Sequence, residues 1–443
     1  MFTPADKMRV QRGLYDLVMQ SQYWPMERLI AYQRTLLTKL VDYARRSVPF
    51  YRSRLEPALT RDGRIDWARW GNIPIIGRQD LIEGFDALQS RRYPPEHGPV
   101  WQMSSSGSTG QPVRVNYNML FAATNEPFNW RSETWQELDW SATSVTRAAD
   151  YNLDTDPPRT SSVWGPPWLA SAQAGRMVDL GRSTSTEVAL RFLQQLGPCY
   201  LTTGPNSLHM YAMEARRLGI DVRLKAGLGQ GEGTTPAAHI AVREVFEAPL
   251  YERYSSREAG RMAHACTHQR GMHQNMEKVL VEIIDEQGKP CPPGVEGRVV
   301  VTPLYNTINP LIRYEQGDMA YWGQPCTCGR TLPIIAKITG RTSAIFRHPD
   351  GRATHRFYTQ EARDALKCGI WQIAQVGPLD FEVRYVPNDW DVPADEETAR
   401  AIFLDVYFSD ARVAFKRLRT LRATPADKYL EYVYEVKEAA PAG

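Results

Sequence analysis

A stretch rich in serine, threonine and glycine, residues 104–112, has the composition of a loop that could wrap a polyphosphate. Gly107 and Gly110 permit backbone conformations that are closed to other residues. The hydroxyl groups that could act as donors to phosphate belong to Ser105, Ser106, Ser108 and Thr109. The stretch is not a Walker A loop, because Gln111 and Pro112 follow Gly110 where that motif needs Lys and Ser or Thr. A flexible surface linker of the same composition is an equal alternative.

Cysteine and histidine side chains in two segments could bind a metal ion. Cys326 and Cys328 supply two thiolates, and Cys266 with His268 or His273 supplies a thiolate and an imidazole. Two such pairs can close a tetrahedral zinc site, and a site with four protein ligands is structural because no position stays open for a substrate. The alternative is a set of reduced, unliganded side chains.

Length, charge and composition limit the classes of protein that remain. A chain of 443 residues with 42% hydrophobic residues is expected to form two or three domains. A formal net charge of +3 without a long block of one sign gives no indication of a nucleic-acid partner. The first residues lack a secretory pattern, and no apolar stretch approaches the roughly 20 residues that span a bilayer. We expect a cytoplasmic protein with reduced cysteines and no membrane partner.

The elements that must position these residues alternate between helices and strands in the first part of the chain. Apolar residues at helical spacing predict helices over residues 26–46, 185–196 and 207–218, and short apolar runs predict strands over 199–202 and 224–228. From residue 278 the pattern favours a strand pair, residues 279–284 and 297–302. The expected fold class is α/β, with mixed sheets and helices in a large N-terminal domain.

A small α+β domain is expected at the C-terminal end. Strand patterns cover residues 381–386 and 429–436, and a helix pattern covers residues 396–403. We therefore predict a large domain over residues 1–340, which includes a β-rich part at 260–335 with the candidate zinc ligands, and a small mobile domain over residues 341–443.

Several segments, taken in order, resemble the adenylate-forming ligases, and most closely the phenylacetate–CoA ligases with the related capsule-type and deazaflavin-coenzyme adenylating proteins. The loop Ser105–Pro112 looks like the phosphate loop of that family. Residues 48–52 (Val-Pro-Phe-Tyr-Arg), 204–207 (Gly-Pro-Asn-Ser), 231–233 (Gly-Glu-Gly), 254–258 (Tyr-Ser-Ser-Arg-Glu) and 310–318 (Pro-Leu-Ile-Arg-Tyr-Glu-Gln-Gly-Asp) are similar to its other motifs. The resemblance extends over most of the chain.

The resemblance implies a nucleotide site. Gly231 and Glu232 would border adenine, Tyr254 would stack on it, and Glu258 would hold Mg²⁺, since a carboxylate suits a hard cation that bridges phosphates. Two positions depart from the pattern. Ser255 replaces a glycine, and Arg257 replaces a threonine or serine that contacts the α-phosphate.

The later motifs imply a ribose contact and a hinge. Asp318 would accept hydrogen bonds from the ribose hydroxyls, and Arg341 would reach the nucleotide at the domain hinge. The acidic pair usual after this arginine is replaced by Ser343 and Ala344. In the C-terminal domain, Lys428 is the best match to the family's catalytic lysine, which would offset charge repulsion between the carboxylate and the α-phosphate. Lys416 and Lys437 are weaker candidates.

The resemblance also favours one imidazole over the other for zinc. Some family members have a structural zinc whose histidine lies in a Gly-x-His element like residues 271–273. The predicted set is therefore Cys266, His273, Cys326 and Cys328.

Together these residues predict an AMP-forming acid–thiol ligase. It would use ATP and Mg²⁺ to convert a small carboxylic acid to its acyl-adenylate and then transfer the acyl group to a thiol, CoA in the nearest family. An aromatic or apolar acid is expected, because Trp164 and Trp168 could line an apolar pocket. Adenylation with an amine, carrier-protein or non-carboxylate acceptor and a non-catalytic nucleotide-binding relative are the alternatives. The oligomeric state stays open, with a homodimer as one option.

Overall fold

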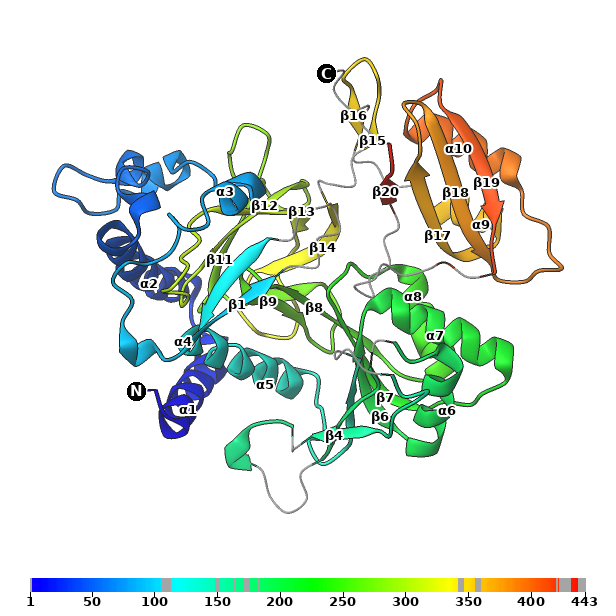
Figure 1. Cartoon of the computed structure of the whole chain (residues 1–443), viewed down its shortest axis with the longest axis horizontal. Helices are drawn as coiled ribbons and strands as arrows, with labels where there is room; N and C mark the ends of the chain where they lie inside the picture. Colours follow the sequence, from blue (N-terminus) through cyan, green and yellow to red (C-terminus); the bar gives the residue numbers. More distant parts are fainter. Residues whose placement is uncertain are drawn as a thin grey trace.

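A computed structural model shows a twelve-stranded mixed sheet with helices packed against it and a separate four-stranded sheet near the C-terminus (Figure 1). The structure describes residues 2–104, 113–147, 152–161, 164–169, 175–181, 183–341, 346–354, 360–419, 421 and 432–436. In the described residues, no helix is both long enough and apolar enough to cross a membrane.

The α-helices of the described residues are α1 (Pro4–Ser21), α2 (Met26–Ser47), α3 (Arg78–Glu83), α4 (Met119–Ala123), α5 (Glu126–Trp135), α6 (Thr186–Leu196), α7 (Pro205–Leu218), α8 (Pro236–Phe246), α9 (Gln360–Leu366) and α10 (Glu396–Val406). Short 3-10 helices cover Pro49–Tyr51, Glu56–Ala58, Trp67–Asn72, Pro95–His97 and Pro167–Leu169. The helices predicted over 26–46, 185–196 and 207–218 correspond to α2, α6 and α7.

The large sheet has, in spatial order, strands β11 (Val279–Ile284), β12 (Gly297–Pro303), β13 (Tyr314–Trp322), β14 (Ile334–Arg341), β10 (Met272–Gln274), β9 (Gly260–Ala265), β8 (Leu250–Ser256), β7 (Leu224–Gln230), β6 (Cys199–Thr203), β3 (Ser144–Thr146), β5 (Met177–Asp179) and β4 (Arg159–Ser161). Strands β5, β3, β6, β7 and β8 are parallel, and the strands from β8 to β11 are antiparallel. The strand pair predicted over 279–284 and 297–302 is the antiparallel pair β11–β12 at one end of this sheet.

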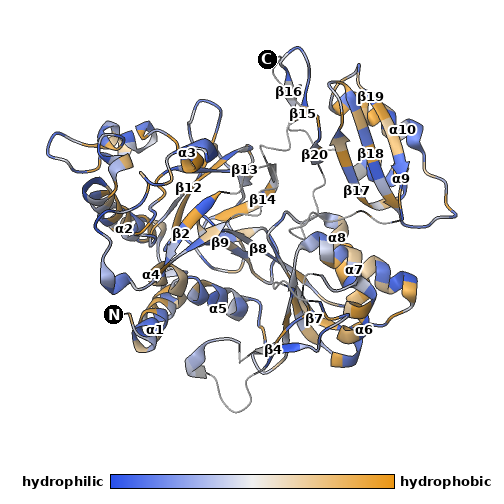
Figure 2. Ribbon diagram, viewed as in Figure 1, coloured by the Kyte–Doolittle hydropathy of each residue, from blue (hydrophilic) through white to orange (hydrophobic). Residues whose placement is uncertain are grey.

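The parallel half of the sheet is covered by helices because each crossover between parallel strands needs a connecting element. Helices α6, α7 and α8 contribute to one apolar core with β3, β6 and β8, and Leu201 and Leu208 lie fully buried in it. Figure 1 shows these helices together beside β6 and β7, and Figure 2 shows that they carry both apolar and polar residues, as expected for helices with one buried face. The other face of the sheet, toward α5, holds a smaller aromatic cluster that includes Trp164, Tyr200 and Tyr251.

Three further sheets complete the described strands. The hairpin β1 (Val100–Ser104) and β2 (Arg114–Asn118) encloses the serine-rich loop, which lies outside the described residues. A two-stranded sheet joins β15 (Phe346–Arg347) to β16 (Ala353–Thr354). The four-stranded sheet has the order β19 (Arg412–Arg417), β18 (Asp380–Pro387), β17 (Cys368–Gln375) and β20 (Tyr432–Tyr434).

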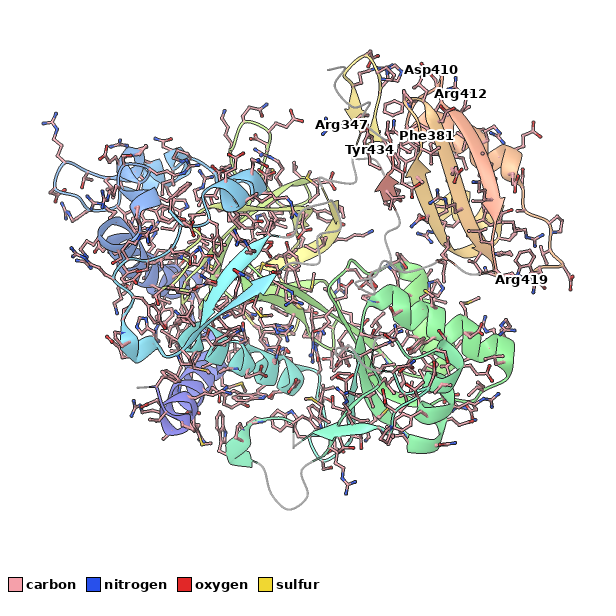
Figure 3. All side chains as sticks on the ribbon, viewed as in Figure 1. Arg347, Phe381, Asp410, Arg412, Arg419 and Tyr434 are labelled. Atoms are coloured by element: carbon pink, nitrogen blue, oxygen red, sulfur yellow. The ribbon has the colours of Figure 1, made fainter. Side chains whose placement is uncertain are left out.

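The four-stranded sheet has its own apolar core with α9 and α10, built around Trp371, Phe381 and Phe403. Figure 3 shows Phe381 and Tyr434 among its strands, Asp410 and Arg412 at the start of β19, and Arg419 past the opposite end. A separate core is consistent with the small α+β domain expected past residue 341, whose boundary and mobility stay predictions. A satellite cluster in which Met210 of α7 packs with Ile370 and Leu421 connects it to the large sheet's helices.

Candidate active site

The predicted nucleotide residues gather where the parallel strands β7 and β8 end. Ligands of α/β proteins bind at the carboxyl ends of parallel strands, because loops there leave a crevice above the sheet. Gly231 and Glu232 directly follow β7. Gly231 has a φ of +87°, in the left-handed region that favours glycine. The Glu232 carboxylate accepts a hydrogen bond from the Asn206 backbone N–H at 3.0 Å, at the N-terminus of α7. The side chain of Glu232 therefore caps the N-terminus of α7, while the Glu232 backbone lies at the candidate site.

Tyr254 and Asp318 are in direct contact. The Tyr254 hydroxyl donates a hydrogen bond to Asp318 Oδ2 at 2.8 Å, and both residues are buried. Their strands, β8 and β13, are separated by three strands in the sheet order, so the sheet must curve to bring the two side chains together. A second contact, from Gln316 Nε2 to Ser256 Oγ at 2.8 Å, joins the same two strands. Two residues predicted to bind opposite parts of one nucleoside thus lie side by side.

Glu258 lies in the turn between β8 and β9 and is almost fully buried. Among the described residues its carboxylate has no ion-pair or hydrogen-bond partner, although burying an unpaired charge is costly. A divalent cation would supply the missing positive charge, so the donor fits the Mg²⁺ predicted there.

Tyr117 of β2 ties the serine-loop hairpin to this turn. Its hydroxyl donates to the Arg257 backbone oxygen at 2.5 Å. Burial raises the pKa of Tyr117 to about 12, and the nearby Glu258 carboxylate adds to the shift. The phenol therefore stays protonated and acts as a donor at neutral pH. The Arg257 side chain itself is exposed. Sequence reasoning missed Tyr117, since an isolated tyrosine in a strand pattern gives no signal of its partner.

Arg261 of β9 also lies at this edge and was not predicted. Its Nη1 donates to Gln230 Oε1 at 3.2 Å and to Ser255 Oγ at 3.4 Å. These contacts place a guanidinium between the ends of β7 and β8. A single arginine in a strand resembles any surface residue in sequence, so no pattern could have identified it.

Other predicted site residues lie outside what the structure describes. The serine-loop residues 105–110, the candidate catalytic Lys428, its competitor Lys437 and the hinge positions Ser343 and Ala344 are among them. For Arg341 only the backbone is described, and its Cα pairs with Asp318 across β13 and β14. The other competitor, Lys416, is committed to an ion pair with Glu382 at 2.5 Å.

The two tryptophans expected to line one substrate pocket, Trp164 and Trp168, pack against different partners. Trp164 is buried against Tyr200, with ring centroids 5.4 Å apart, and donates to the Ala142 backbone oxygen. Trp168 packs against Trp130 of α5 at 5.1 Å and Tyr15 of α1 at 5.5 Å. Trp168 thus joins two helices, whereas Trp164 belongs to the aromatic cluster on the α5 face of the sheet.

The four predicted zinc ligands converge. The donor atoms of Cys266, His273, Cys326 and Cys328 all lie within 4.8 Å of one another. Cys266 Sγ and Cys326 Sγ are 3.8 Å apart, and Cys328 Sγ is 3.4 Å from His273 Nε2. Around a tetrahedral zinc, Zn–S bonds of about 2.3 Å and Zn–N bonds of about 2.0 Å place two sulfurs about 3.8 Å apart and sulfur and nitrogen about 3.5 Å apart. The cluster therefore has the dimensions of a zinc site.

His268, the histidine that was not predicted to bind zinc, has a different partner. His268 is exposed, and its Nδ1 lies 2.9 Å from Thr327 Oγ1. By contrast, burial lowers the pKa of His273 to about 4, which keeps its imidazole neutral as metal ligation requires.

Comparisons with known proteins show which proteins this chain resembles. No family model matches the chain. It is 27% identical over 336 residues to the phenylacetate-coenzyme A ligase of Thermus thermophilus, which covers 72% of this chain and 71% of that protein. It is 25% identical over 332 residues to the phenylacetate-coenzyme A ligase of Aromatoleum evansii, covering 71% of each chain.

A solved structure shows the same fold. The crystal structure of 2-hydroxyisobutyryl-CoA ligase in the postadenylation state, in complex with 2-HIB-AMP, has a TM-score of 0.71 and 20% identity and covers 94% of this chain and 92% of that one. The same enzyme with 2-HIB-AMP and CoA in the thioesterification state has a TM-score of 0.58. The chain is thus similar in sequence to phenylacetate-coenzyme A ligases and similar in fold to 2-hydroxyisobutyryl-CoA ligase.

Proposed function

We propose that the chain is an AMP-forming ligase that joins a carboxylic acid to the thiol of CoA. The observation that carries the proposal is the buried Tyr254–Asp318 pair at the ends of the parallel strands, beside the unpaired carboxylate of Glu258. The adenine base would stack on Tyr254, and Asp318 would accept hydrogen bonds from the ribose hydroxyls. The curated relatives are named as coenzyme A ligases, which supports CoA as the acceptor.

The first step would join the acid to AMP. A carboxylate oxygen attacks the α-phosphorus of ATP, an O–P bond forms, and the bond to the bridging oxygen breaks as pyrophosphate leaves. Glu258 would hold Mg²⁺, whose charge offsets that of the phosphates. The residues 105–110 and Lys428 are proposed to contact the same phosphates. In the second step the CoA sulfur attacks the acyl carbon, its proton passes to solvent, and AMP leaves.

The proposed acid is aromatic or otherwise apolar. The relatives' name, phenylacetate-coenzyme A ligase, supports an aryl acid. The aromatic cluster of Trp164, Tyr200 and Tyr251 lies on the α5 face of the same sheet. Residues 341–443 are proposed to rotate as a unit between the two steps.

The Cys266, His273, Cys326 and Cys328 cluster is proposed to hold a structural zinc. All four ligand positions would be filled by protein, so the ion would stabilise the β-rich part and not take part in the reaction.

Acid-dependent ATP–pyrophosphate exchange tests the proposed function. We expect exchange with at least one aryl acid, and formation of AMP and a CoA thioester, identified by mass, when CoA is added. Glu258→Gln should lower exchange by about 100-fold, because one buried charge–metal contact is worth several kcal/mol of transition-state stabilisation. Glu286→Gln, in an exposed turn, is the matched control and should leave exchange unchanged.

Two results would contradict the proposal. Absence of exchange across aryl and alkyl acids would point to a non-catalytic nucleotide binder. Exchange that Glu258→Gln leaves at the wild-type rate would remove Glu258 as the magnesium ligand.

A further inference from the structure

The face of the sheet toward α5 carries two arginines, Arg253 in the middle of β8 and Arg261 at the start of β9. Arg253 of β8 pairs in register with Gln230 of β7 and with His264 of β9, and Arg261 of β9 pairs with Ser255 of β8. Residues directly opposite in neighbouring strands point to the same face. The two guanidinium groups therefore share the α5 side. Burial lowers the pKa of Arg253, and the nearby charge of Arg261 adds to this shift.

Arg261 has only neutral partners. Its two side-chain contacts within the described part of the chain are the amide oxygen of Gln230 and the hydroxyl of Ser255. No carboxylate of a described residue lies within ion-pair distance of it. Gln230 immediately precedes Gly231, and Ser255 immediately follows Tyr254. The unpaired cation thus lies at the same edge as the proposed nucleotide residues.

Arg253 is buried and incompletely satisfied. It is 7% exposed, its Nη2 reaches Glu133 Oε1 of α5 only at 3.5 Å, and its Nε has no hydrogen-bond partner in the described residues. Glu133 is shared, since it also accepts from Trp140 Nε1 at 3.1 Å. A buried guanidinium whose N–H groups lack acceptors costs free energy unless another group accepts hydrogen bonds from them.

The carboxylates on this face lie beside Arg253 and not beside Arg261. Burial lowers the pKa of Arg253, and the charges of Glu133 and Glu126 of α5 oppose this shift. Arg131 is paired with Glu277 at 2.7 Å. Within the described residues, neither Glu133 nor Glu126 lies within ion-pair distance of Arg261, so this guanidinium keeps donors for another anionic group.

An apolar surface adjoins these arginines. Tyr251 lies two residues before Arg253 on β8 and belongs to the aromatic cluster, and Trp140, which donates to Glu133, packs against that cluster. A ligand that occupies this face would thus meet aromatic rings and a guanidinium with free donors.

We propose that the acid activated by this enzyme is an aryl acid with a second carboxylate, and that Arg261, with Arg253 beside it, binds that second group. This inference rests on the proposed function and narrows its substrate class. A carboxylate matches the planar donor fork of arginine and supplies the negatively charged partner that Arg261 lacks among the described residues. Arg261 is a specificity-determining residue in this view and takes no part in bond making.

Matched acids test the inference on the full-length chain. Initial rates of pyrophosphate release would be measured for phenylacetate, for its meta- and para-carboxyl derivatives, and for the corresponding nitro derivatives. A nitro group has the shape of a carboxylate without its charge. We expect at least one carboxyl derivative to exceed its nitro counterpart in kcat/KM by about tenfold or more, as one charge-assisted hydrogen-bonded pair would give.

Variants identify the residue responsible. Arg261→Leu should reduce the carboxyl-over-nitro preference to within about twofold, mainly through the KM for the carboxyl acid. Arg261→Lys should restore part of the preference because it restores the charge without the fork. Arg243→Leu, an exposed arginine of α8, is the control and should retain the full preference.

Three outcomes would overturn the inference. The nitro acids or phenylacetate could be preferred over the carboxyl derivatives. Arg261→Leu could leave a carboxyl preference intact. It could also slow all acids equally while raising the KM for ATP, which would place Arg261 at the nucleotide. Failure of the proposed function is distinct, because no acid would then release pyrophosphate.

Discussion

The hydroxyl of Tyr254 determines how Asp318 is presented at the candidate site. One carboxylate oxygen of Asp318 accepts from this hydroxyl at 2.8 Å. Because the pair is buried, the hydrogen bond both holds the carboxylate in one orientation and partly offsets the cost of its burial.

Removal of this hydroxyl should weaken nucleotide binding. We expect Tyr254→Phe to raise the KM for ATP about tenfold, because hydrogen bonds to charged groups are worth about 1.5–3 kcal/mol and the aromatic face is retained. The KM for the acid should be nearly unchanged. Steady-state kinetics of pyrophosphate release would measure both constants. Tyr321→Phe, a partly exposed tyrosine of β13, is the control. An unchanged KM for ATP would show that Asp318 does not need this contact.

The sequence predicted the types of residue at the site better than their contacts. It identified Cys266, Cys326 and Cys328 as a group, since thiolates at short spacing have few other roles in a reduced protein, and the structure brings them together. It did not predict the Tyr254–Asp318 bond or the place of Arg261. Both depend on strand register and sheet curvature, which arise only when segments distant in the chain pair.

The segment 326–331 acts as a connector between the β-rich part and the N-terminal helices. Arg330 Nε donates to Gln22 Oε1 at 3.2 Å, and Thr331 donates to the backbone oxygens of Gln22 and Trp24. Trp135 of α5 contacts the His273 ring at 5.2 Å. The junction of α1 and α2, the end of α5 and the Cys/His cluster therefore form one packed unit.

Loss of a cluster ligand should loosen this unit. We expect purified protein to contain one zinc ion per chain and Cys328→Ser to lose it, with a fall in melting temperature and a change in tryptophan fluorescence from Trp135. Elemental analysis and thermal unfolding would measure this. Cys291→Ser, a cysteine outside the cluster, should keep the zinc. Wild-type protein without zinc would refute the metal site while leaving the fold intact.

A buried ion pair fixes α5 against the sheet. Arg131 and Glu277 are fully buried and 2.7 Å apart, and Arg131 also donates to Asn275 Oδ1 at 2.8 Å. Glu277 further accepts from Ser21 at the end of α1. Each charge depends on the other, because no water reaches either group to solvate it.

Glu277→Gln should therefore destabilise the protein strongly. Removal of one partner from a buried pair typically costs about 3–5 kcal/mol of the free energy of unfolding. Glu244→Gln, which breaks the exposed pair with Arg216, should cost under about 1 kcal/mol. Urea unfolding followed by circular dichroism would compare them. A loss for Glu277→Gln as small as that of the control would contradict the role of this pair.

Element prediction succeeded where periodicity was long and failed where sequence was short or irregular. The 22 residues of α2 carry an apolar stripe that is readable without a structure. The three-residue strands β3 and β5 have no such pattern, and they join the sheet near its β4 end only because β6 lies next to β3. Trp164 and Trp168 were expected to line one pocket, but their different partners depend on how α1 and α5 pack.

The molecule has separate cores for the large sheet and the four-stranded sheet, and an ionic contact secures the edge of the smaller one. His348, after β15, lies 3.0 Å from Asp410 and 2.8 Å from Asp350. Hydrogen bonding to Asp410, then to Asp350, raises the pKa of His348. When it is protonated, this imidazole connects the β15–β16 hairpin to the start of β19 through an ion pair.

This contact should make stability depend on pH. A raised pKa in the folded state means that the folded protein binds the proton more tightly, so the stabilisation is complete below the unfolded pKa of about 6.5 and is lost as pH rises through the raised value. His348→Gln should therefore lower the melting temperature at a pH of about 6 and have little effect at a pH of about 8.5. Asp410→Asn should behave alike. An equal loss at both pH values would show that the contact is not ionic.

The contacts of Gln22 and Trp24 with residues 330 and 331 also determine when the N-terminal helices can fold during synthesis. Gln22 and Arg330 are separated by 308 positions in the chain, so α1 and α2 cannot reach their final packing until Thr331 has been synthesised. The apolar faces of α1 and α2 therefore stay exposed during synthesis. Contacts between residues so far apart in the chain also slow folding. Nascent chains that end before Arg330 should leave α1 open to protease, and chains that extend past Thr331 should protect it.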